Sequence, residues 1–584
     1  MKKFFSIAFI FLLLPLSLFA QPALTFHQAV TRQSPITIYP IQPEPGSTIN
    51  RTQLMIEFPK VAGAVVYDVL LQEVRTEGKK TDTVFVREQT DSSNATLISR
   101  LEFGRNYIWQ YKAYDAARQL RKRSPYYKFS TGAFPAADPK KFRARVIKNA
   151  SRGNSGVITF DHAHLAVDRL GKPVWCLPPV AGKIHEAELI RDLRISNAGT
   201  VTFLTTKNAF EMSIDGRILW QAPNDGKVSG DTVEHYHHEL RRLPNGNYMT
   251  LSSKYVKRRL PGDTAQVKLE YGTIIEYDFL GRVAWYWSAH TYLKEEDFFR
   301  TAPDGKKQLV QPHINAFDVD EKEEFVYACF RDLNRVIRID KRTGDVSASY
   351  SMQTAKQAQD LLRKPHDMKV LPDGSIVVFN GDSAGDPKMT SNVIVLSQPE
   401  EGERPKALWK FDCKFDTLGD GKSARGGGVE ALPNGNFLVG MGSLSRTIEV
   451  TRSKKIMWDV FTESWNENGQ RWIPFGQYRS HYASSLYPCY FTASVSEETW
   501  RKSTKSVQLE IVNEGTEADG YNVIYKLRGD SRSSGIKVDT LAPGEKKILE
   551  LIPVVAPGRG QVLEVTVSSK NNSGFVRTFR VPHK

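Results

Sequence analysis

The sequence predicts an all-β protein whose largest part is a six-bladed β-propeller flanked by two small β-sandwiches. Short strands that end in Trp or Tyr after a Gly or a basic turn recur six times along the 584 residues. A second strand, rich in Leu or Val, follows a turn in several of these units, as in "LPNGNYMTLSSK" and "LPDGSIVVFNGD". Helical periodicity is missing from most of this region, which favours strands. The terminal aromatic residues are Trp175, Trp220, Trp285, Tyr350, Trp409 and Trp458.

These aromatic residues are 45 to 65 positions apart, which fits a unit of four short strands, and we expect the propeller to occupy residues 145–490. A large array of β-sandwiches is the alternative architecture. Residues 36–132 contain alternating, aromatic-rich strands such as "VVYDVLLQEV" and resemble a fibronectin type III domain. Residues 495–584 alternate in the same way and predict a second small sandwich, fibronectin III-like or Ig-like.

Residues 1–20 have the pattern of a signal peptide. Lys2 and Lys3 form the positive start, an apolar stretch follows, and Ala20 precedes the candidate cleavage site. We expect export of the mature chain, most simply to a bacterial periplasm; an uncleaved N-terminal anchor is the alternative. No later stretch is long and apolar enough to span a bilayer, so no stable membrane association is expected after cleavage.

The chain carries a formal net charge of +15, which becomes +13 when Lys2 and Lys3 leave with the signal peptide. The basic residues are scattered rather than clustered, which argues against nucleic acid as a partner and fits an anionic small substrate. Four cysteines lie far apart without a C-x-x-C pair, so neither a zinc knuckle nor a disulfide framework is expected. The sequence leaves open whether one disulfide bridge forms. The oligomeric state is also open, a homodimer included. The cysteines are Cys176, Cys329, Cys413 and Cys489.

Histidines precede the "L-P-x-G" turn at matched positions in two units. His238 and His366 each lie five residues before the leucine of their turn, Gly427 takes this place in another unit, and His313 lies one residue further from its own turn. Equivalent positions of propeller blades lie at equivalent heights around the central channel. We therefore expect His238, His313 and His366 to converge on one pocket. Strand alternation predicts that His237 points away from the side used by His238 and supports the site from behind.

Three kinds of chemistry could use such a cluster. Three imidazoles and a water form a catalytic zinc pattern, one histidine could act as a nucleophile, or the cluster could bind an anion with Arg331. Glu239 and Asp367 directly follow two of the histidines and are predicted to face away. The expected lack of inward carboxylates disfavours metal-dependent hydrolysis. We therefore predict no metal and no cofactor.

Four segments together resemble the bacterial arylsulfate sulfotransferase family: "HHELRRLPNGNY", "QPHINAFDVDEKEEFVYACFRDLNRVIRIDKRTGDV", "KPHDMKVLPDGSIVVFNGD" and "YRSHYASSLYP". The resemblance covers roughly residues 145–490. It implies a six-bladed propeller in the periplasm and an enzyme that transfers a sulfuryl group from a phenolic sulfate ester to a phenolic acceptor. It also implies a ping-pong mechanism through a sulfohistidine, without a nucleotide sulfate donor.

The resemblance also implies roles for individual residues. His366, in the His-Asp motif, would be the nucleophile. His238, His313 and Arg331 would bind the sulfuryl oxygens and neutralise their charge, and Asn315 would orient a neighbour. The physics fits these roles, because imidazole with a pKa near 6.5 attacks while neutral, and cationic donors stabilise charge on the oxygens and on the departing phenolate.

A phenol pocket needs aromatic walls, and the segment "NGQRWIPFGQYRSHY" supplies Trp472, Phe475, Tyr478 and Tyr482. Of these, Trp472 and Tyr478 are predicted to contact the substrate, together with Asn315 and His237. Two other functions remain open from the sequence: a non-catalytic exported propeller that binds an anionic or glycan ligand, and a hydrolase that uses metal-bound water.

Overall fold

The computed structural model describes the chain from residue 41 to residue 583, with short gaps. The gaps are residues 78–79, 100, 134–140, 151–155, 181, 185–187, 260–265, 302–303, 306, 321, 351–360, 382–389, 400–403, 416–420, 424, 497–499, 501–505 and 556. The predicted signal peptide lies outside the described residues. Nearly all regular structure in the described residues is strand, which confirms the predicted all-β class.

The N-terminal domain is a sheet of six strands with a separate pair. The large sheet has the order β1-β8-β6-β3-β4 with β7 paired to β6, and β2 pairs with β5. Inward residues alternate with outward ones along β3, as its sequence predicts for a half-buried strand. The strands are β1 (Thr48–Ile49), β2 (Leu54–Glu57), β3 (Val66–Glu77), β4 (Lys80–Asp91), β5 (Ala95–Ile98), β6 (Asn106–Tyr114), β7 (Leu120–Arg123) and β8 (Tyr127–Thr131).

The middle of the chain forms a ring of six sheets, here called the sheet ring, as far as the described residues show. Sheet one contains β10 (Val157–Phe160), β11 (Leu165–Val167), β12 (Pro173–Cys176) and β36 (Ser480–Ala483). Sheet two contains β13 (Arg191–Ile195), β14 (Thr200–Leu204), β15 (Ala209–Ser213) and β16 (Ile218–Gln221). Sheet three contains β17 (His235–Arg242), β18 (Tyr248–Arg259), β19 (Gln266–Tyr277) and β20 (Val283–Ser288).

The remaining three sheets follow in sequence order. Sheet four contains β23 (Ile314–Val319), β24 (Phe325–Phe330), β25 (Arg335–Asp340) and β26 (Val346–Ser349). Sheet five contains β27 (Pro365–Val370), β28 (Ile376–Asn380), β29 (Asn392–Leu396) and β30 (Ala407–Asp412). Sheet six contains β31 (Gly428–Ala431), β32 (Phe437–Gly440), β33 (Arg446–Val450), β34 (Ile456–Asn466), β35 (Arg471–Pro474) and β9 (Phe142–Asn149).

The sheet ring closes through its innermost strands. Each innermost strand contacts that of the next sheet, from β13 through β17, β23, β27 and β31 to β36, which contacts β13 again. The closing strand β36 comes from the far end of this region, yet it pairs with β10 at its beginning. Segments more than three hundred residues apart thus share sheet one. The short elements between the sheets are η1 (Ala289–Thr291), η2 (Glu295–Phe298), η3 (Gly442–Leu444), β21 (Phe299–Thr301) and β22 (Lys307–Leu309).

Six carboxylates join neighbouring sheets across their inner strands. Each accepts a hydrogen bond of 2.7 to 3.2 Å from a backbone N–H of the next sheet. Charge-assisted hydrogen bonds of this kind are stronger than neutral ones, and a buried carboxylate that loses its donors is costly. The six links therefore fix the spacing of the inner strands. The carboxylates belong to Asp161, Asp192, Glu239, Asp318, Asp367 and Glu430.

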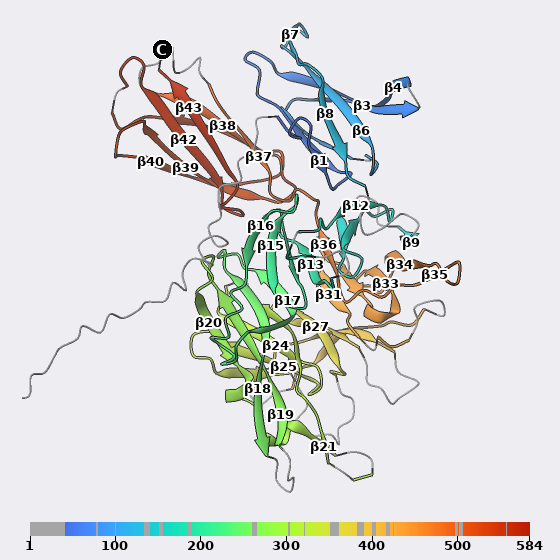
Figure 1. The fold of residues 1–584 in the computed structure, drawn as a ribbon. Coiled ribbons are helices and arrows are strands. Elements are labelled where there is room, and N and C mark those ends of the chain that lie inside the picture. The colour runs from blue at the N-terminus through green and yellow to red at the C-terminus, as the bar shows by residue number, and fades with distance from the viewer. Residues whose placement is uncertain are drawn as a thin grey trace, which may run out of the picture.

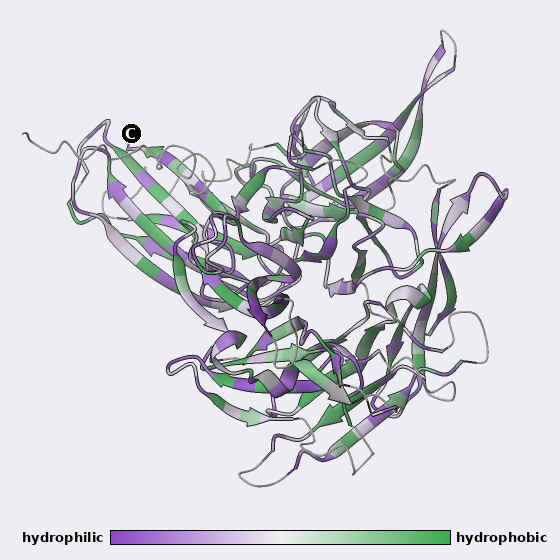
Figure 2. Cartoon of the chain, turned by 60° about the horizontal axis from the view of Figure 1, so that its bottom comes forward, coloured by the Kyte–Doolittle hydropathy of each residue, from purple (hydrophilic) through white to green (hydrophobic). Residues whose placement is uncertain are grey.

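The C-terminal domain consists of two sheets, with orders β37-β38-β41 and β40-β39-β42-β43. Figure 2 shows hydrophobic and hydrophilic residues alternating along its strands, as expected when one face of each sheet is buried. Its strands are β37 (Phe491–Val495), β38 (Val507–Asn513), β39 (Asp519–Leu527), β40 (Ser534–Leu541), β41 (Lys546–Leu551), β42 (Val562–Ser569) and β43 (Val576–Pro582).

The two flanking domains lie side by side at one end of the sheet ring (Figure 1). Glu57 of the N-terminal domain accepts hydrogen bonds from Tyr490 at 2.6 Å and from Arg577 at 2.8 Å. Arg51 of the same domain forms an ion pair with Asp215 of the sheet ring. One continuous apolar cluster also runs from the C-terminal domain into sheets one and two. The flanking domains are therefore packed against the ring rather than merely tethered to it.

No helix in the described part of the chain is long and apolar enough to cross a membrane. The four cysteines are all described and buried, and no disulfide joins them. The single bridge that the sequence left open is thus not formed here.

Candidate active site

The inner strand of sheet three, β17, contains a bulge that brings two histidines together. The register with β18 shifts between His237 and Leu240, and His238 has a left-handed φ of 65°. The Nδ1 atoms of His237 and His238 are consequently 2.6 Å apart. The prediction that His237 points away from the side of His238 is wrong, because it assumed regular alternation and the bulge interrupts it.

A third histidine continues this contact into the next sheet. His313 directly precedes β23 with a φ of 50°, and its Nε2 lies 3.1 Å from the Nε2 of His238. Its Nδ1 is 3.9 Å from Oε1 of Glu270 on β19. The hydroxyl of Ser253 donates to the same carboxylate at 2.7 Å. We call His237, His238, His313 and Glu270 the histidine chain.

The electrostatics of the histidine chain favour the neutral forms of His237 and His238 and the charged form of Glu270. Burial, with the neighbouring rings and Arg191, holds the pKa of His238 well below its usual value. Burial also lowers the pKa of His237 to about 4. Burial acts to raise the pKa of Glu270, but the hydrogen-bonding groups of His313 and Ser253 outweigh it and lower that pKa to about 2.

His366 lies on β27, the inner strand of sheet five, and is buried. Burial and then the charge of Arg331 lower its pKa to about 3, so the imidazole is neutral at pH 7. Its Nδ1 has no hydrogen-bond partner among the described residues. Gly381 packs against the ring so closely that a Cβ there would lie 2.5 Å from Cδ2 of His366. Only glycine fits beside this imidazole.

Cations surround His366 from neighbouring segments. Arg331 follows β24, and its backbone N–H donates to the carbonyl of His313 at 3.0 Å. The buried Nε of Arg331 has no hydrogen-bond partner in the described structure, so this guanidinium has spare capacity for an anion. Lys364 has a φ of 44° and pairs with Asp332. The field at His366 is therefore positive.

Asn315 is completely buried on β23, and its side chain connects sheets four and five. Its Nδ2 donates to the carbonyl of Pro365 at 2.9 Å, which holds the backbone immediately before His366. Its Oδ1 has no partner among the described residues. Asn315 thus lies where the sequence expected an orienting residue.

Sequence reasoning missed Arg479, which lies beneath the histidines and is completely buried. Its guanidinium donates to the carbonyl of Asn315 at 2.9 Å and to that of His366 at 3.1 Å. It also contacts Asp367 at 3.0 Å and Glu239 at 3.3 Å. The only sign of this arginine in the sequence is its place beside Tyr478 in "YRSHY", a segment in which the aromatic residues are the more conspicuous pattern.

The expectation that carboxylates are lacking on the inner side is wrong. Glu239 and Asp367 are buried between the inner strands, where Arg479 and Lys369 contact both. Arg194 adds a further contact with Glu239 at 3.1 Å. Their charges are therefore compensated by protein cations. Within the described ranges, no group of three His, Cys, Asp or Glu side chains is arranged to hold a metal ion.

The two aromatic residues predicted to contact substrate lie in different places. The Tyr478 ring meets His238 edge to face at 5.6 Å, and its buried hydroxyl has no partner among the described residues. Burial raises the pKa of Tyr478 to about 12, so the hydroxyl is a neutral donor. Trp472 lies on the edge strand β35, where it contacts Trp465 and Arg143. The structure does not bring Trp472 to the histidines, because the segment between it and Tyr478 turns inward from the edge.

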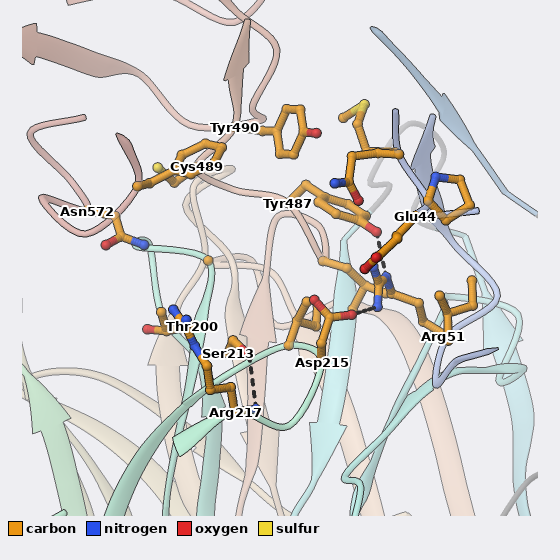
Figure 3. A pocket seen from close by; sticks show the side chains of 18 of the residues that line it. Glu44, Arg51, Thr200, Ser213, Asp215, Arg217, Tyr487, Cys489, Tyr490 and Asn572 are labelled. Atoms are coloured by element: carbon orange, nitrogen blue, oxygen red, sulfur yellow. Dashed lines mark hydrogen bonds and ion pairs between the residues drawn. The ribbon is translucent and has the colours of Figure 1, made fainter. Parts of the chain in front are cut away.

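A separate cavity of about 470 Å³ lies where the two flanking domains meet sheet two (Figure 3). Tyr487, Tyr490 and the ion pair of Arg51 with Asp215 line it. None of the predicted site residues reaches it. The histidines and this cavity therefore lie in different parts of the molecule.

The fold and the site define an all-β protein with a closed ring of sheets that holds neutral histidines beside cations. Residues 143–386 match the model of the family described as Arylsulfotransferase (ASST), a stretch that includes His238, His313, Arg331 and His366. This match agrees with the family resemblance that the sequence motifs predicted. Tyr478 and Arg479 lie beyond the matched stretch.

No curated protein matches the chain. Among solved structures, a protein of unknown function from Bacteroides caccae is 15% identical, with a TM-score of 0.33, and covers 55% of this chain and 93% of its own. A catalytically inactive virginiamycin B lyase from Staphylococcus aureus is 12% identical, with a TM-score of 0.29, and covers 55% and 88%. At this level of similarity, these structures carry no information about the reaction of the chain.

Proposed function

We propose that the protein is an aryl-sulfate sulfotransferase that moves a sulfuryl group from a phenolic sulfate ester to a phenolic acceptor. The mechanism is ping-pong, with a sulfohistidine at His366 and without a nucleotide donor. The observation that carries the proposal is the state of His366, a buried neutral imidazole that faces cations. The match of residues 143–386 to the arylsulfotransferase family model supports the same class of reaction.

Two half-reactions balance without a cofactor. A ring nitrogen of His366 attacks the donor sulfur, the N–S bond forms, and the S–O bond to the aryl group breaks. The phenolate leaves with the electron pair, accepts a hydrogen bond from an imidazole N–H of the histidine chain and takes its proton from solvent. The acceptor phenol then gives its proton to a neutral imidazole of the chain and attacks the sulfohistidine sulfur, the N–S bond breaks, and the imidazole releases the proton to solvent.

The groups around His366 have separate tasks in this mechanism. Arg331, with its unpartnered Nε, binds sulfuryl oxygens and stabilises their growing charge. His238 and His313 hydrogen-bond the phenolic oxygen and exchange its proton. Asn315 positions the backbone of His366, and the neutral Tyr478 hydroxyl contacts the substrate. Removal of one charge-stabilising donor of this kind costs about 10²–10³ in rate.

We further infer that the sheet ring is a six-bladed propeller over residues 145–490, between sandwiches at 36–132 and 495–584, and that residues 1–20 direct export to the periplasm. The sequence order of the strands within the sheets and the closed contacts of the inner strands support the propeller. N-terminal sequencing of protein recovered from a bacterial periplasm tests the export, with Gln21 expected as the first residue.

The reaction is tested with the purified mature protein and 4-nitrophenyl sulfate, with and without phenol, beside His366→Ala. We expect nitrophenolate release that depends on phenol and disappears in the variant. Incubation with the donor alone should leave a sulfuryl adduct on the peptide that contains residue 366, detected by mass spectrometry. If the folded protein releases no nitrophenolate with several phenols, the alternative of a non-catalytic propeller that binds an anionic or glycan ligand replaces this proposal.

A further inference from the structure

The hairpin of β18 and β19 extends beyond the body of the sheet ring. Both strands have 12 residues, and they pair without interruption from Tyr248 opposite Tyr277 to Arg259 opposite Gln266. Their inner halves are buried, whereas six of the twelve residues of the outer halves are exposed. Figure 1 shows the hairpin reaching away from the two flanking domains. Core packing explains the inner half of the hairpin but not the outer half.

One face of this hairpin begins at the candidate active site. Cross-strand partners share a face, and so do alternate residues of one strand. The face that carries Glu270 of the histidine chain therefore also carries Tyr255, then Lys257 opposite Lys268, then Arg259. We call Tyr255, Lys257, Lys268 and Arg259 the basic stripe.

Side-chain contacts agree with this placement. The Tyr255 ring meets the His235 ring at 5.4 Å, and the Nζ of Lys268 lies 3.8 Å from the centre of the Tyr255 ring. The opposite face carries Val256, Leu269 and Val267, which pack with the core of sheets three and four. The polar face is thus the outward one, and it leads away from the histidine chain.

The charges of the basic stripe are only partly compensated within the described structure, where Lys268 helps to lower the pKa of Asp231. No carboxylate there lies within ion-pair distance of Lys257, Lys268 or Arg259. The nearest carboxylates on this face have other partners: Asp231 contacts His235, and Glu270 is held by the histidine chain and by Ser253. Lysines directly opposite each other in a sheet are destabilising. An anion between them would remove that cost.

We propose that the basic stripe binds a second anionic group of an extended phenolic substrate, so that the enzyme prefers phenols with a distant carboxylate or sulfate. This inference rests on the proposed function, because it places the phenolic end at the histidines. Strands rise about 3.4 Å per residue, so the stripe lies roughly 7 to 14 Å beyond Glu270. Tyr255 offers an exposed aromatic surface along the way, with Lys268 above it. Donor and acceptor use the site in turn, so the preference applies to both.

The test compares two charge-reversal variants of the full mature chain. Lys257→Glu with Lys268→Glu changes the basic stripe. Lys254→Glu with Arg258→Glu makes the same change of net charge on the opposite face and serves as the matched control. All four side chains lie outside the buried core, and thermal melting checks that both variants fold as the wild type does.

The acceptors are hydroxybiphenylcarboxylic acid, its uncharged methyl ester and phenol, each with 4-nitrophenyl sulfate as the donor. In the stripe variant we expect the KM for the carboxylic acid to rise about tenfold, with the KM for the ester unchanged, and no change in the control variant. Added salt should weaken the preference of the wild type for the acid over the ester. An equal rise for acid and ester, or the same rise in the control variant, would overturn the inference.

The assay separates failure of the stripe from failure of the proposed function. Transfer from 4-nitrophenyl sulfate to phenol reports the reaction alone. If the wild type shows no transfer, calorimetric titration of the acid and the ester against the wild type and the stripe variant still measures the stripe. Equal affinity of the wild type for the two compounds would then rule out the inference by itself.

Discussion

Two histidines of the inner strands, His366 and His481, are buried to a similar degree, but their pKa values are shifted in opposite directions. His366 has a ring nitrogen without a partner and cations nearby, and its pKa is lowered to about 3. His481 on β36 contacts Glu430 through Nδ1 at 2.6 Å and Asp192 through Nε2 at 2.9 Å. Burial and the charge of Arg194 act to lower the pKa of His481, but the two carboxylates outweigh them and raise it.

The difference teaches that the neighbours of a buried imidazole decide its role. With a carboxylate on each nitrogen, His481 is a cation that joins sheets one, two and six, and it has no lone pair to offer. Among cations, His366 stays neutral and keeps the lone pair that a nucleophile needs. His481 therefore stabilises the framework of the sheet ring, and His366 is available for chemistry.

The largest expected effect is on activity and arises at His366. His366→Gln should lower the phenol-dependent release of nitrophenolate by a factor on the order of 10⁴ to 10⁶, because no covalent intermediate can form. The melting temperature should not fall, because the variant removes an unpartnered polar ring. The comparison fails if His366→Gln destabilises the protein as much as the corresponding change at His481.

The corresponding change, His481→Gln, should act on stability. Removal of His481 leaves Arg194 as the remaining ion-pair partner of both Asp192 and Glu430, and we expect a loss of about 3 kcal/mol in the free energy of unfolding. Urea denaturation measures this loss. Activity of the folded fraction should stay within a few-fold of the wild type. A stability equal to that of the wild type would show that the two carboxylates do not need the cation.

Gly381→Ala tests how tightly His366 is positioned. The added methyl group would overlap the imidazole, so the ring must shift, and a displacement near 1 Å can cost about 10² in rate. Single-turnover kinetics with 4-nitrophenyl sulfate measure the first half-reaction. Gly535→Ala, at a strand glycine without a left-handed φ where a Cβ would meet nothing nearer than 3.8 Å, controls for the general effect of replacing a glycine in a strand.

The pH dependence of the nitrophenolate burst and of stability distinguishes His366 from His481, because their pKa values are shifted in opposite directions. With a folded pKa of about 3, His366 stays neutral on acidification, so the burst of nitrophenolate, read after quenching into base, should stay level from about pH 7 to about pH 4. A histidine with an ordinary pKa would lose the burst below about pH 6.5. The stability due to His481 should be fully present below about pH 6.5 and be lost as the pH rises through its raised pKa. His481→Gln should abolish that loss.

The sequence motifs predicted much of the site, because the position before each turn is a local property. Matched offsets before "L-P-x-G" identified His238 and His366, and the strand and turn patterns predicted the all-β class. The orientation of His237 could not be predicted in this way. It depends on a bulge at His238 and Glu239, which interrupts the regular alternation of the strand without a clear mark in the sequence.

The missed groups depend on contacts between distant segments. Arg479 is 240 residues from Glu239 and 113 from His366, and nothing near it in the sequence indicates these partners. The six carboxylate links follow from the same closure of the sheet ring. Trp472 was wrongly placed because an aromatic-rich segment does not reveal which of its residues lies on an edge strand.

The closing strand β36 has a consequence for the order in which the protein is made. Synthesis runs from the N-terminus, so the segments with His238, His313 and His366 leave the ribosome before Arg479 and β36. Until that last strand pairs with β10, the carbonyl of His366 lacks its guanidinium partner and the first and sixth sheets stay apart. The surroundings of His366 are therefore complete only after almost the whole ring has been synthesised, and an unfinished chain contains this histidine without its guanidinium partner.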